Sequence, residues 1–325
     1  MLITVYNLLI RLILGRKISL DALSSLLALY PLRTALDVRC HFAAPWVIDH
    51  GAVRRGIAPY HILASGQAAV VLDGAPPIAL HAGDVVVFPH GAGHKLLTEN
   101  AAQAAPQFVS YDDHAIAVRS NSGAGPISDV LCGQFEFDQA AGEVLLRALP
   151  DMILVRTAGR ADFAGLGNLI AMLRAESETL RPGAAAVLAQ LSSALFALVM
   201  RAWLEQTDKP PGLFALMAER RLQLLLQAVL AAPGQDWTLE TMAQRSHMSR
   251  ATFVRLFTRV AGATPAAVLL QIRMAQATRL LQQGARSTGD IGADVGYRSE
   301  AAFNRVFKRH VGVTPGSLRR ASREA

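Results

Sequence analysis

Two segments of the chain repeat one pattern fifty residues apart. Ser249 to Pro265 reads SRATFVRLFTRVAGATP, and Ser299 to Pro315 reads SEAAFNRVFKRHVGVTP. Nine of the seventeen aligned residues are identical. The apolar residues are largely kept, whereas many of the polar residues differ. The repeat predicts two copies of one packed unit, each of which presents its own polar surface.

Each copy predicts two short helices joined by a tight turn. In the first copy Thr238 is the expected N-cap of a helix over TLETMAQRS, and Ser249 caps the helix that follows the turn. In the second copy GDIGADVGY and SEAAFNRVFKRHVG are the two helices. The second helix of each copy has an apolar stripe at helical spacing, formed by Phe253, Leu256, Phe257 and Val260 and by Phe303, Val306 and Phe307. Such pairs are typical of helix-turn-helix units whose second helix enters a DNA major groove.

The opposite faces of the two second helices carry the candidate DNA-binding residues. They are Arg250, Ala251, Thr252, Val254, Arg255 and Arg259 in the first copy, and Arg298, Ser299, Glu300, Asn304, Arg305 and Lys308 in the second. Arginine can bond bidentately to guanine O6 and N7, although an arginine on a helix surface is more often solvated or bound to phosphate. We predict that Arg255 and Arg305 contact DNA.

A helix between the copies sets their spacing. Thr264 and Pro265 predict its N-cap and first residue, and Gly284 is the expected residue just past its end. A helix of about twenty residues rises by roughly 30 Å, and successive major-groove segments on one side of B-DNA lie about 34 Å apart. One chain could therefore place both units on adjacent groove segments.

The positive charge of the protein is concentrated in this C-terminal part. Of the net charge of +7, Leu213 to the end carries 16 Lys and Arg against 7 Asp and Glu, or +9, which leaves −2 for the rest. A polyanionic partner, double-stranded DNA, is expected for the C-terminal part only.

The N-terminal part has a different character. Residues 57–113 contain short β-branched runs separated by Gly, Pro and Asp, whereas helices are expected after about residue 140. TDKPPG, from Thr207 to Gly212, is the clearest linker. We expect an α+β multidomain chain, divided into a helical extension (1–36), a β-rich sensor domain (37–139), a helical linker or dimerisation segment (140–212) and a DNA-binding domain (213–325). The last would hold helix-turn-helix units at about 238–262 and 289–312 and a linker helix at about 265–283.

The C-terminal motifs resemble the AraC/XylS family of bacterial transcription regulators. The resemblance covers about Leu222 to Arg320 and is carried by LETMAQRSHMSRATFVRLFTRVAGATP and DIGADVGYRSEAAFNRVFKRHVGVTP. It implies an all-α double helix-turn-helix in which Ala251, Val254, Arg255, Asn304 and Arg305 lie at DNA-contacting positions, and it implies RNA polymerase as a partner. Gly292 departs from the family, which usually has Ala there. Since glycine costs a helix about 1 kcal/mol relative to alanine, we expect a softer helix.

The segment PYHILASGQAAVVLDGAPPIALHAGDVVVFPHGAGHKL resembles the cupin domains of such regulators, which are small antiparallel β-barrels. Metal-binding cupins usually have a His-x-His pair, a downstream Glu and a later His. Here His61 stands alone, so an enzyme is disfavoured and no cofactor is expected. His50, His61, His90 and His94 could still gather around a weaker transition-metal site, since imidazole suits Cu, Zn and Ni, although each alone is more often a packed or solvent-facing residue.

The chain has two cysteines, Cys40 and Cys132, which fits a reducing cytosol rather than a disulfide scaffold. Cys40 lies between Arg39 and His41, whose positive charge would favour a reactive thiolate. VRCHFAAPW together with the later LCG resembles a subgroup of cupin-bearing AraC regulators that includes reactive-chlorine-responsive (RclR-like) activators. That resemblance implies oxidant sensing by both cysteines; the alternative is that each is a small core residue.

These observations lead to one function with two kinds of signal. We expect a cytoplasmic activator that binds promoter DNA and responds to oxidants. The Leu-rich helical segment either packs on the barrel or forms the contact of a homodimer. A small-molecule or metal effector inside the barrel is the alternative signal. MLITVYNLLIRLILGRK is apolar, but it is interrupted by Arg11 and is shorter than the roughly 20 residues that span a bilayer, so we expect no membrane contact.

Overall fold

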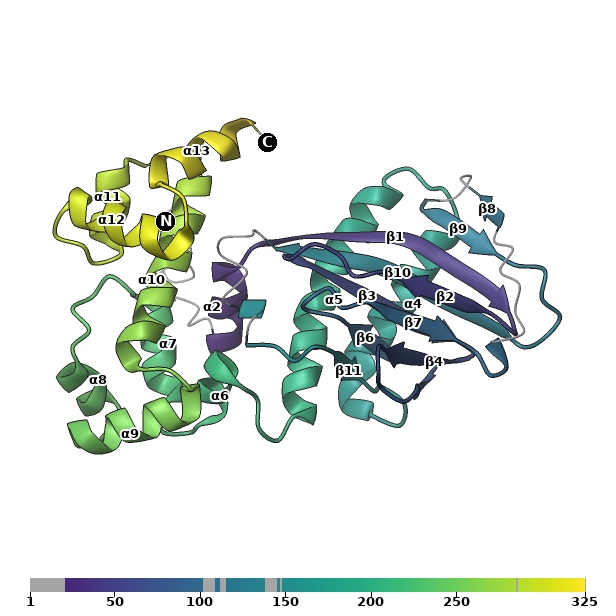
Figure 1. The fold of residues 1–325 in the computed structure, drawn as a ribbon, viewed down its shortest axis with the longest axis horizontal. Coiled ribbons are helices and arrows are strands. Elements are labelled where there is room, and N and C mark those ends of the chain that lie inside the picture. Colours follow the sequence, from purple (N-terminus) through teal and green to yellow (C-terminus); the bar gives the residue numbers. More distant parts are fainter. Residues whose placement is uncertain are drawn as a thin grey trace, which may run out of the picture.

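The computed structural model describes residues 21–101, 109–111, 115–137, 145–146, 148–284 and 286–324. The apolar run at residues 1–17 and the first part of the expected helical extension lie outside the described residues. β-Strands occupy the N-terminal half and helices follow from residue 161 onward, which confirms a β-rich domain followed by a helical C-terminal region (Figure 1).

The strands form two sheets. The seven-stranded sheet has the order β11-β6-β3-β10-β1-β9-β8 and the four-stranded sheet the order β2-β7-β4-β5. The strands of the first are β1 (Leu32–Ala43), β3 (Ile57–Ser65), β6 (Val85–Val87), β8 (Val109–Tyr111), β9 (Ala117–Ser120), β10 (Ile127–Phe137) and β11 (Ile153–Val155). Those of the second are β2 (Val47–His50), β4 (Gln67–Leu72), β5 (Ile78–His81) and β7 (His94–Leu97).

The expected antiparallel barrel is therefore wrong in two details. The sheets share no hydrogen-bonded strand pair among the described residues, and β1 pairs with β9 in parallel. Closure would require the edge strands to pair, but β8 and β11 have three residues each. The chain instead passes from one sheet to the other at Gly66, which has φ 86°. A Cβ there would lie 2.5 Å from the carbonyl oxygen of Ile127, so the corner requires glycine.

The seven-stranded sheet is covered on both faces. One face packs on the four-stranded sheet through a cluster that includes Phe42, Val130 and Cys132. The other face packs through Leu131 and Phe135 on two long helices, α4 (Ala164–Glu178) and α5 (Ala184–Gln206), which lie behind the sheet in Figure 1. This arrangement explains why β10, at the centre of the sheet, is buried along most of its length. A short 3-10 helix, η2 (Ala161–Phe163), precedes α4.

Among the described residues, α5 is the one helix that is long and apolar enough to cross a membrane, with a mean hydropathy of 1.6. The helices α9 and α10, which meet at a bend of 60°, pass the same test only when they are counted together as one span. In the fold, Leu188, Leu195 and Val199 of α5 are buried in the core beside β1 and α4. Packing on the sheet accounts for these buried apolar positions of α5.

The remaining helices form the C-terminal region. They are α6 (Gly212–Ala218), α7 (Gln223–Ala231), α8 (Leu239–Arg245), α9 (Arg250–Ala261), α10 (Pro265–Gln282), α11 (Thr288–Asp294), α12 (Glu300–Val311) and α13 (Pro315–Glu324). The N-terminal helix α2 (Ala22–Leu29), which leads directly into β1, packs against α7 and α10. Side chains of the N-terminal part and of the C-terminal helices therefore belong to one hydrophobic core, which includes Leu26 of α2 and Leu225 of α7.

Candidate functional site

The first helix-turn-helix unit consists of α8 and α9. Thr238 caps α8 by accepting a hydrogen bond from the Thr241 amide, and Ser249 caps α9 by accepting one from the Thr252 amide, as the sequence predicted. Phe253, Leu256 and Phe257 are buried against α8 and α6, which orients the opposite face of α9 outward. A left-handed glycine, Gly262, ends α9 and leads into α10.

The second unit consists of α11 and α12 and repeats this construction. Ser299 accepts a hydrogen bond from the Ala302 amide, and Gly312 ends α12 in the left-handed conformation. Its core is separate from the rest and contains Phe303 and Phe307, both fully buried. Gly292 of α11 lies directly against this core: a Cβ there would approach the Phe303 side chain to 3.1 Å. The glycine that we expected to soften the helix also allows the close crossing of α11 and α12.

The two units lie near the two ends of α10 (Figure 1). With 18 residues, α10 has a length of about 27 Å at 1.5 Å per residue. The predicted caps Thr264, Pro265 and Gly284 are confirmed, because Thr264 accepts from the Ala267 amide and Gly284, at φ 73°, follows the last turn. One rigid helix therefore sets the separation of α9 and α12.

The candidate DNA-binding side chains are distributed as follows. Arg250, Ala251, Arg255, Arg259, Arg298, Ser299, Glu300, Arg305 and Lys308 are exposed, whereas Thr252, Val254 and Asn304 are half-buried. Within the described part of the chain, neither Arg255 nor Arg305 has an ion-pair partner, and Oδ1 of Asn304 has no hydrogen-bond partner. The two exposed arginines are free to bind an external ligand, whereas Oδ1 of Asn304 is buried.

The two cysteines meet in the core between the sheets. Cys132 lies on β10 two residues from Val130, the partner of Cys40 on β1, so the two side chains share one face of the sheet. Both are buried and reduced, and both belong to the core cluster between the sheets. The neighbouring Cys40 thiol and burial raise the pKa of the Cys132 thiol well above its ordinary value.

The expected activation of Cys40 by Arg39 is not what the fold provides. Neighbouring residues of a strand point to opposite faces. On the face opposite to Cys40, Arg39 donates two hydrogen bonds of 2.8 Å to the carboxylate of Asp129 and a third to Glu178. His41, the other expected neighbour, is exposed. The basic charges beside Cys40 in the sequence are thus directed away from its thiol.

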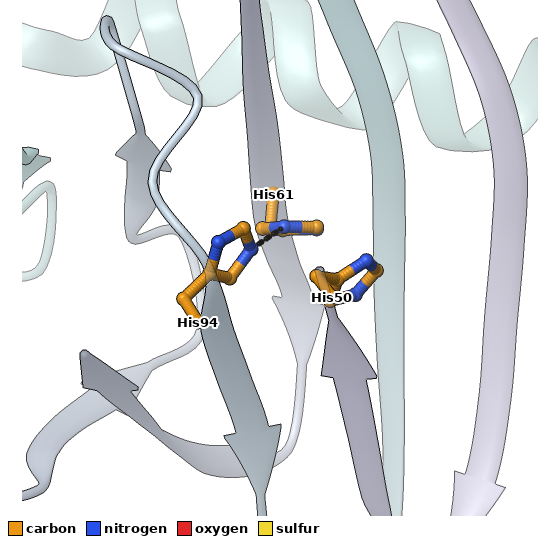
Figure 2. Close-up of side chains that lie close together, drawn as sticks. All are labelled: His50, His61 and His94. Carbon is orange, nitrogen blue, oxygen red and sulfur yellow. Dashed lines mark hydrogen bonds between the residues drawn. The ribbon is translucent and has the colours of Figure 1, made fainter. Parts of the chain in front are cut away.

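Three of the four candidate histidines come together beside Cys132. His50 of β2, His61 of β3 and His94 of β7 each offer one ring nitrogen, and these atoms all lie within 4.8 Å of one another (Figure 2). His90 lies apart, with its Nε2 bonded to the Leu149 carbonyl oxygen. His61 and His94 come from different sheets, so the cluster bridges the space between the sheets.

Hydrogen bonds fix the tautomers in this cluster. Nδ1 of His94 donates to the carbonyl oxygen of Ala92 at 2.8 Å, which leaves its Nε2 without a proton in the neutral ring. Nε2 of His61, at 2.7 Å from that atom, must then be the donor (Figure 2). Nδ1 of His61 consequently accepts from the Cys132 thiol at 3.1 Å. The chain of contacts runs from Cys132 through His61 and His94 to the backbone.

Burial keeps all three rings neutral. It lowers the pKa of His50 to about 4 and lowers the pKa values of His61 and His94, and for His61 the neighbouring imidazoles add to the effect. His61 and His94 are 3% and 2% exposed, while His50 is half-buried at the edge of the cluster.

Sequence reasoning missed the contact between Cys132 and His61. Residues 132 and 61 are direct partners in the pairing of β10 with β3, and only the strand register brings them together. Their separation along the chain carries no such signal. The buried carboxylate of Asp129 was missed for the same reason, since its partners Arg39 and Arg174 come from β1 and α4.

Comparisons with known proteins agree with these two parts. Residues 21–205 match the family model described as a cupin, and residues 242–321 match that of a helix-turn-helix domain. The RCS-specific HTH-type transcriptional activator RclR of Escherichia coli (strain K12) is 29% identical over 94% of this chain and 99% of its own length. The HTH-type transcriptional regulator MtrA of Neisseria gonorrhoeae is 30% identical over 93% and 98%. The DNA-binding domain of AdpA, solved in complex with a target DNA, is 33% identical with a TM-score of 0.30 over 31% of this chain and 91% of that chain.

The cupin match spans more than half of the chain, and the relation to MtrA extends over nearly the full length of both proteins. The relatives are named transcription regulators, and the helix-turn-helix match accounts for DNA binding rather than catalysis. The chain therefore belongs to the AraC family of DNA-binding transcription regulators that carry an N-terminal cupin domain.

Proposed function

We propose that this regulator reads two adjacent major-groove segments through α9 and α12, and that its cupin-like domain changes state when a strong oxidant joins Cys40 to Cys132. The observation that supports the sensing step is the position of both buried cysteines on one face of the paired strands β1 and β10. We assign the sensor to residues 37–139, a helical segment with a possible dimer contact to 140–212, and DNA binding to 213–325.

DNA recognition is assigned to the outward faces of the two second helices. Arg255 and Arg305 occupy equivalent positions in the two units, both are exposed, and both lack an ion-pair partner among the described residues. Bidentate hydrogen bonds from such arginines to guanine discriminate against a wrong base by about 1–3 kcal/mol. Arg250, Arg259, Arg298 and Lys308 are better suited to phosphates, where they position the helices without specifying sequence.

Replacing Arg255 by alanine is expected to weaken operator binding by about five-fold or more, because one bidentate contact of 1–3 kcal/mol is lost. The duplex is first selected by the wild-type protein from a random pool, and affinity is then measured by fluorescence anisotropy at several salt concentrations. Arg305→Ala should act similarly at a different half of the duplex.

The matched control is Arg201→Ala, which removes an exposed arginine from α5, outside the DNA-binding units. It should leave affinity within two-fold. Equal affinity of Arg255→Ala and wild type, with circular dichroism unchanged, would refute the assignment.

The thiol chemistry favours a strong oxidant. Hypochlorous acid can oxidise both thiols to one disulfide, accepting two electrons and leaving as chloride, water and a proton. The thiolate is the nucleophile toward milder oxidants such as peroxide, and the raised pKa of Cys132 keeps its thiol protonated. We therefore expect hypochlorite to act at lower concentrations than hydrogen peroxide.

A route from the thiols to the DNA-binding units lies in β1. Cys40 is on this strand, and α2, which leads into it, packs against α7 and α10. The first unit shares the large core with α2, whereas the second has its own core. A disulfide shifts the balance between two arrangements only by its differential stabilisation of one of them. We propose that this shift acts on the first unit.

In cells carrying Cys40→Ser, hypochlorite is expected to induce a reporter placed behind the selected operator at least ten-fold less than in wild-type cells. Serine keeps the size of the side chain but cannot form the disulfide. Cys132→Ser should behave alike, and the basal reporter signal should remain. Full induction in either variant would end the oxidant proposal while leaving DNA binding intact.

The regulator is further proposed to act in the cytoplasm as an activator that contacts RNA polymerase. Its two free cysteines suit a reducing compartment. The space between the sheets, which an effector would need to enter, is filled by Phe42, Trp46 and Phe88. This packing supports the thiol signal over the alternative of a bulky effector.

A further inference from the structure

The three-histidine cluster has the chemistry of a metal site rather than of a packed core. Each ring comes from a different strand, and the ring nitrogens lie within 4.8 Å of one another. Two of the rings are almost completely buried. Neutral imidazole is a preferred ligand of zinc, copper and nickel ions.

Two of the three rings, those of His94 and His50, have a nitrogen available inside the cluster. The Ala92 carbonyl fixes the proton of His94 on Nδ1, so that Nε2 faces His61 with its lone pair. Nε2 of His50 is buried and has no hydrogen-bond partner among the residues the structure describes. A buried polar atom without a partner is costly, and a bound ion at the cluster would remove part of that cost.

The spacing of His61 and His94 is close to that of two ligands on one coordinated ion. Imidazole nitrogens bind zinc at about 2.0–2.1 Å, so two of them in a tetrahedral site are about 3.3 Å apart. The Nε2 atoms of His61 and His94 are 2.7 Å apart. An ion between them would take the place of the proton on Nε2 of His61, and the neutral ring would then carry that proton on Nδ1, where it donates to Cys132 Sγ. The pair would widen by about 0.6 Å, which small side-chain rotations can supply.

The surroundings resemble the support that metal ligands usually have. Ligating histidines donate their other ring N–H to a second group, which fixes the ring orientation. His94 does so to Ala92, and His61 has Cys132 in the equivalent position. Phe88 stacks on the His94 ring with centroids 3.6 Å apart.

We propose that His50, His61 and His94 bind one divalent transition-metal ion of the zinc, nickel and copper group, and that this ion links the four-stranded sheet to the seven-stranded sheet. The ligand set has three imidazoles from three strands and no carboxylate. It leaves a fourth position of a tetrahedral ion for water, next to the half-buried His50. DNA binding and disulfide formation do not require this ion, but the site adjoins the proposed sensor because His61 contacts Cys132.

Zinc binding by the reduced, chelator-treated full-length protein tests the proposal. Titration calorimetry should give one zinc ion per chain, and a hundred-fold excess over Kd should raise the melting temperature by about 5–11 °C. His50→Ala should lower the affinity at least ten-fold. His50→Asn, which better preserves the volume of the ring, serves if the alanine variant fails to fold. Cobalt substitution should give the visible absorption of a tetrahedral ion with nitrogen ligands.

His90→Ala is the matched control, since His90 lies outside the cluster, and it should bind zinc as the wild type does. Cys40→Ser should also retain one zinc ion. Unchanged zinc affinity in both His50 variants, no zinc in the wild type, or a sulfur-to-cobalt charge-transfer band would each overturn the site. Operator affinity of the same preparations is measured separately, so a failure of this site is distinguishable from a failure of the proposed function.

Discussion

Phe303→Ala is expected to disable the second helix-turn-helix unit while the rest of the molecule stays folded. Phe303 is fully buried in a small core that it shares with Phe307 and Ile291, and it packs against Tyr297 with ring centroids 5.7 Å apart. Truncating a buried phenylalanine costs about 3–5 kcal/mol. A core of seven buried residues has few others to take over these contacts, so α11 and α12 should open locally.

Hydrogen exchange and operator binding detect this opening. Amide protection should fall over 286–320 and remain over β1 and β10, and affinity for a duplex carrying both half-sites should fall at least ten-fold. Phe303→Leu retains much of the volume and should cause a smaller loss. Val313→Ala, at a side chain 42% exposed, should cause none. Retained protection over 286–320 in Phe303→Ala would contradict the separate core.

The C-terminal region could be predicted from the sequence in detail because its structure is determined locally. Caps such as Ser249 and Ser299 lie within three residues of the amides that they bind. The apolar positions of α9 and α12 follow the helical period, so burial of Phe253 and Phe303 follows from spacing alone. Which arginine contacts a base depends on the docked DNA and stays a prediction.

The sensor domain could be predicted only in outline because its contacts join distant parts of the chain. Short β runs indicated strands, but the pairing of β1 with β9 and the passage of the chain between sheets at Gly66 depend on the whole sheet. Cys132 and His61 are 71 residues apart and hydrogen-bonded. Proximity in the sequence was also a poor guide to the histidine cluster. His90 is the candidate nearest to His94 along the chain, yet it stays outside the cluster.

Asp129→Asn is expected to destabilise the sensor domain by about 3 kcal/mol or more, because breaking a buried ion pair leaves an uncompensated charge. Asp129 is completely buried on β10, and its carboxylate binds Arg39 of β1 and Arg174 of α4. The amide keeps the shape but loses the charge, so the guanidinium of Arg39, 11% exposed, has no full partner. The melting temperature of the sensor domain should fall by roughly 6–12 °C.

Glu178→Gln is the control at the same network. Glu178 binds the same Arg39 at 3.0 Å but is 44% exposed, and such a partner contributes less than about 1 kcal/mol. A comparable loss in both variants would show that the effect belongs to the surface and not to the buried carboxylate. Because Arg39 precedes Cys40 and Asp129 lies three residues before Cys132, the network also fixes the two strands whose thiols meet. The Asp129→Asn variant should accordingly form the Cys40–Cys132 disulfide at a different hypochlorite concentration from the wild type, and the Glu178→Gln variant at the same one.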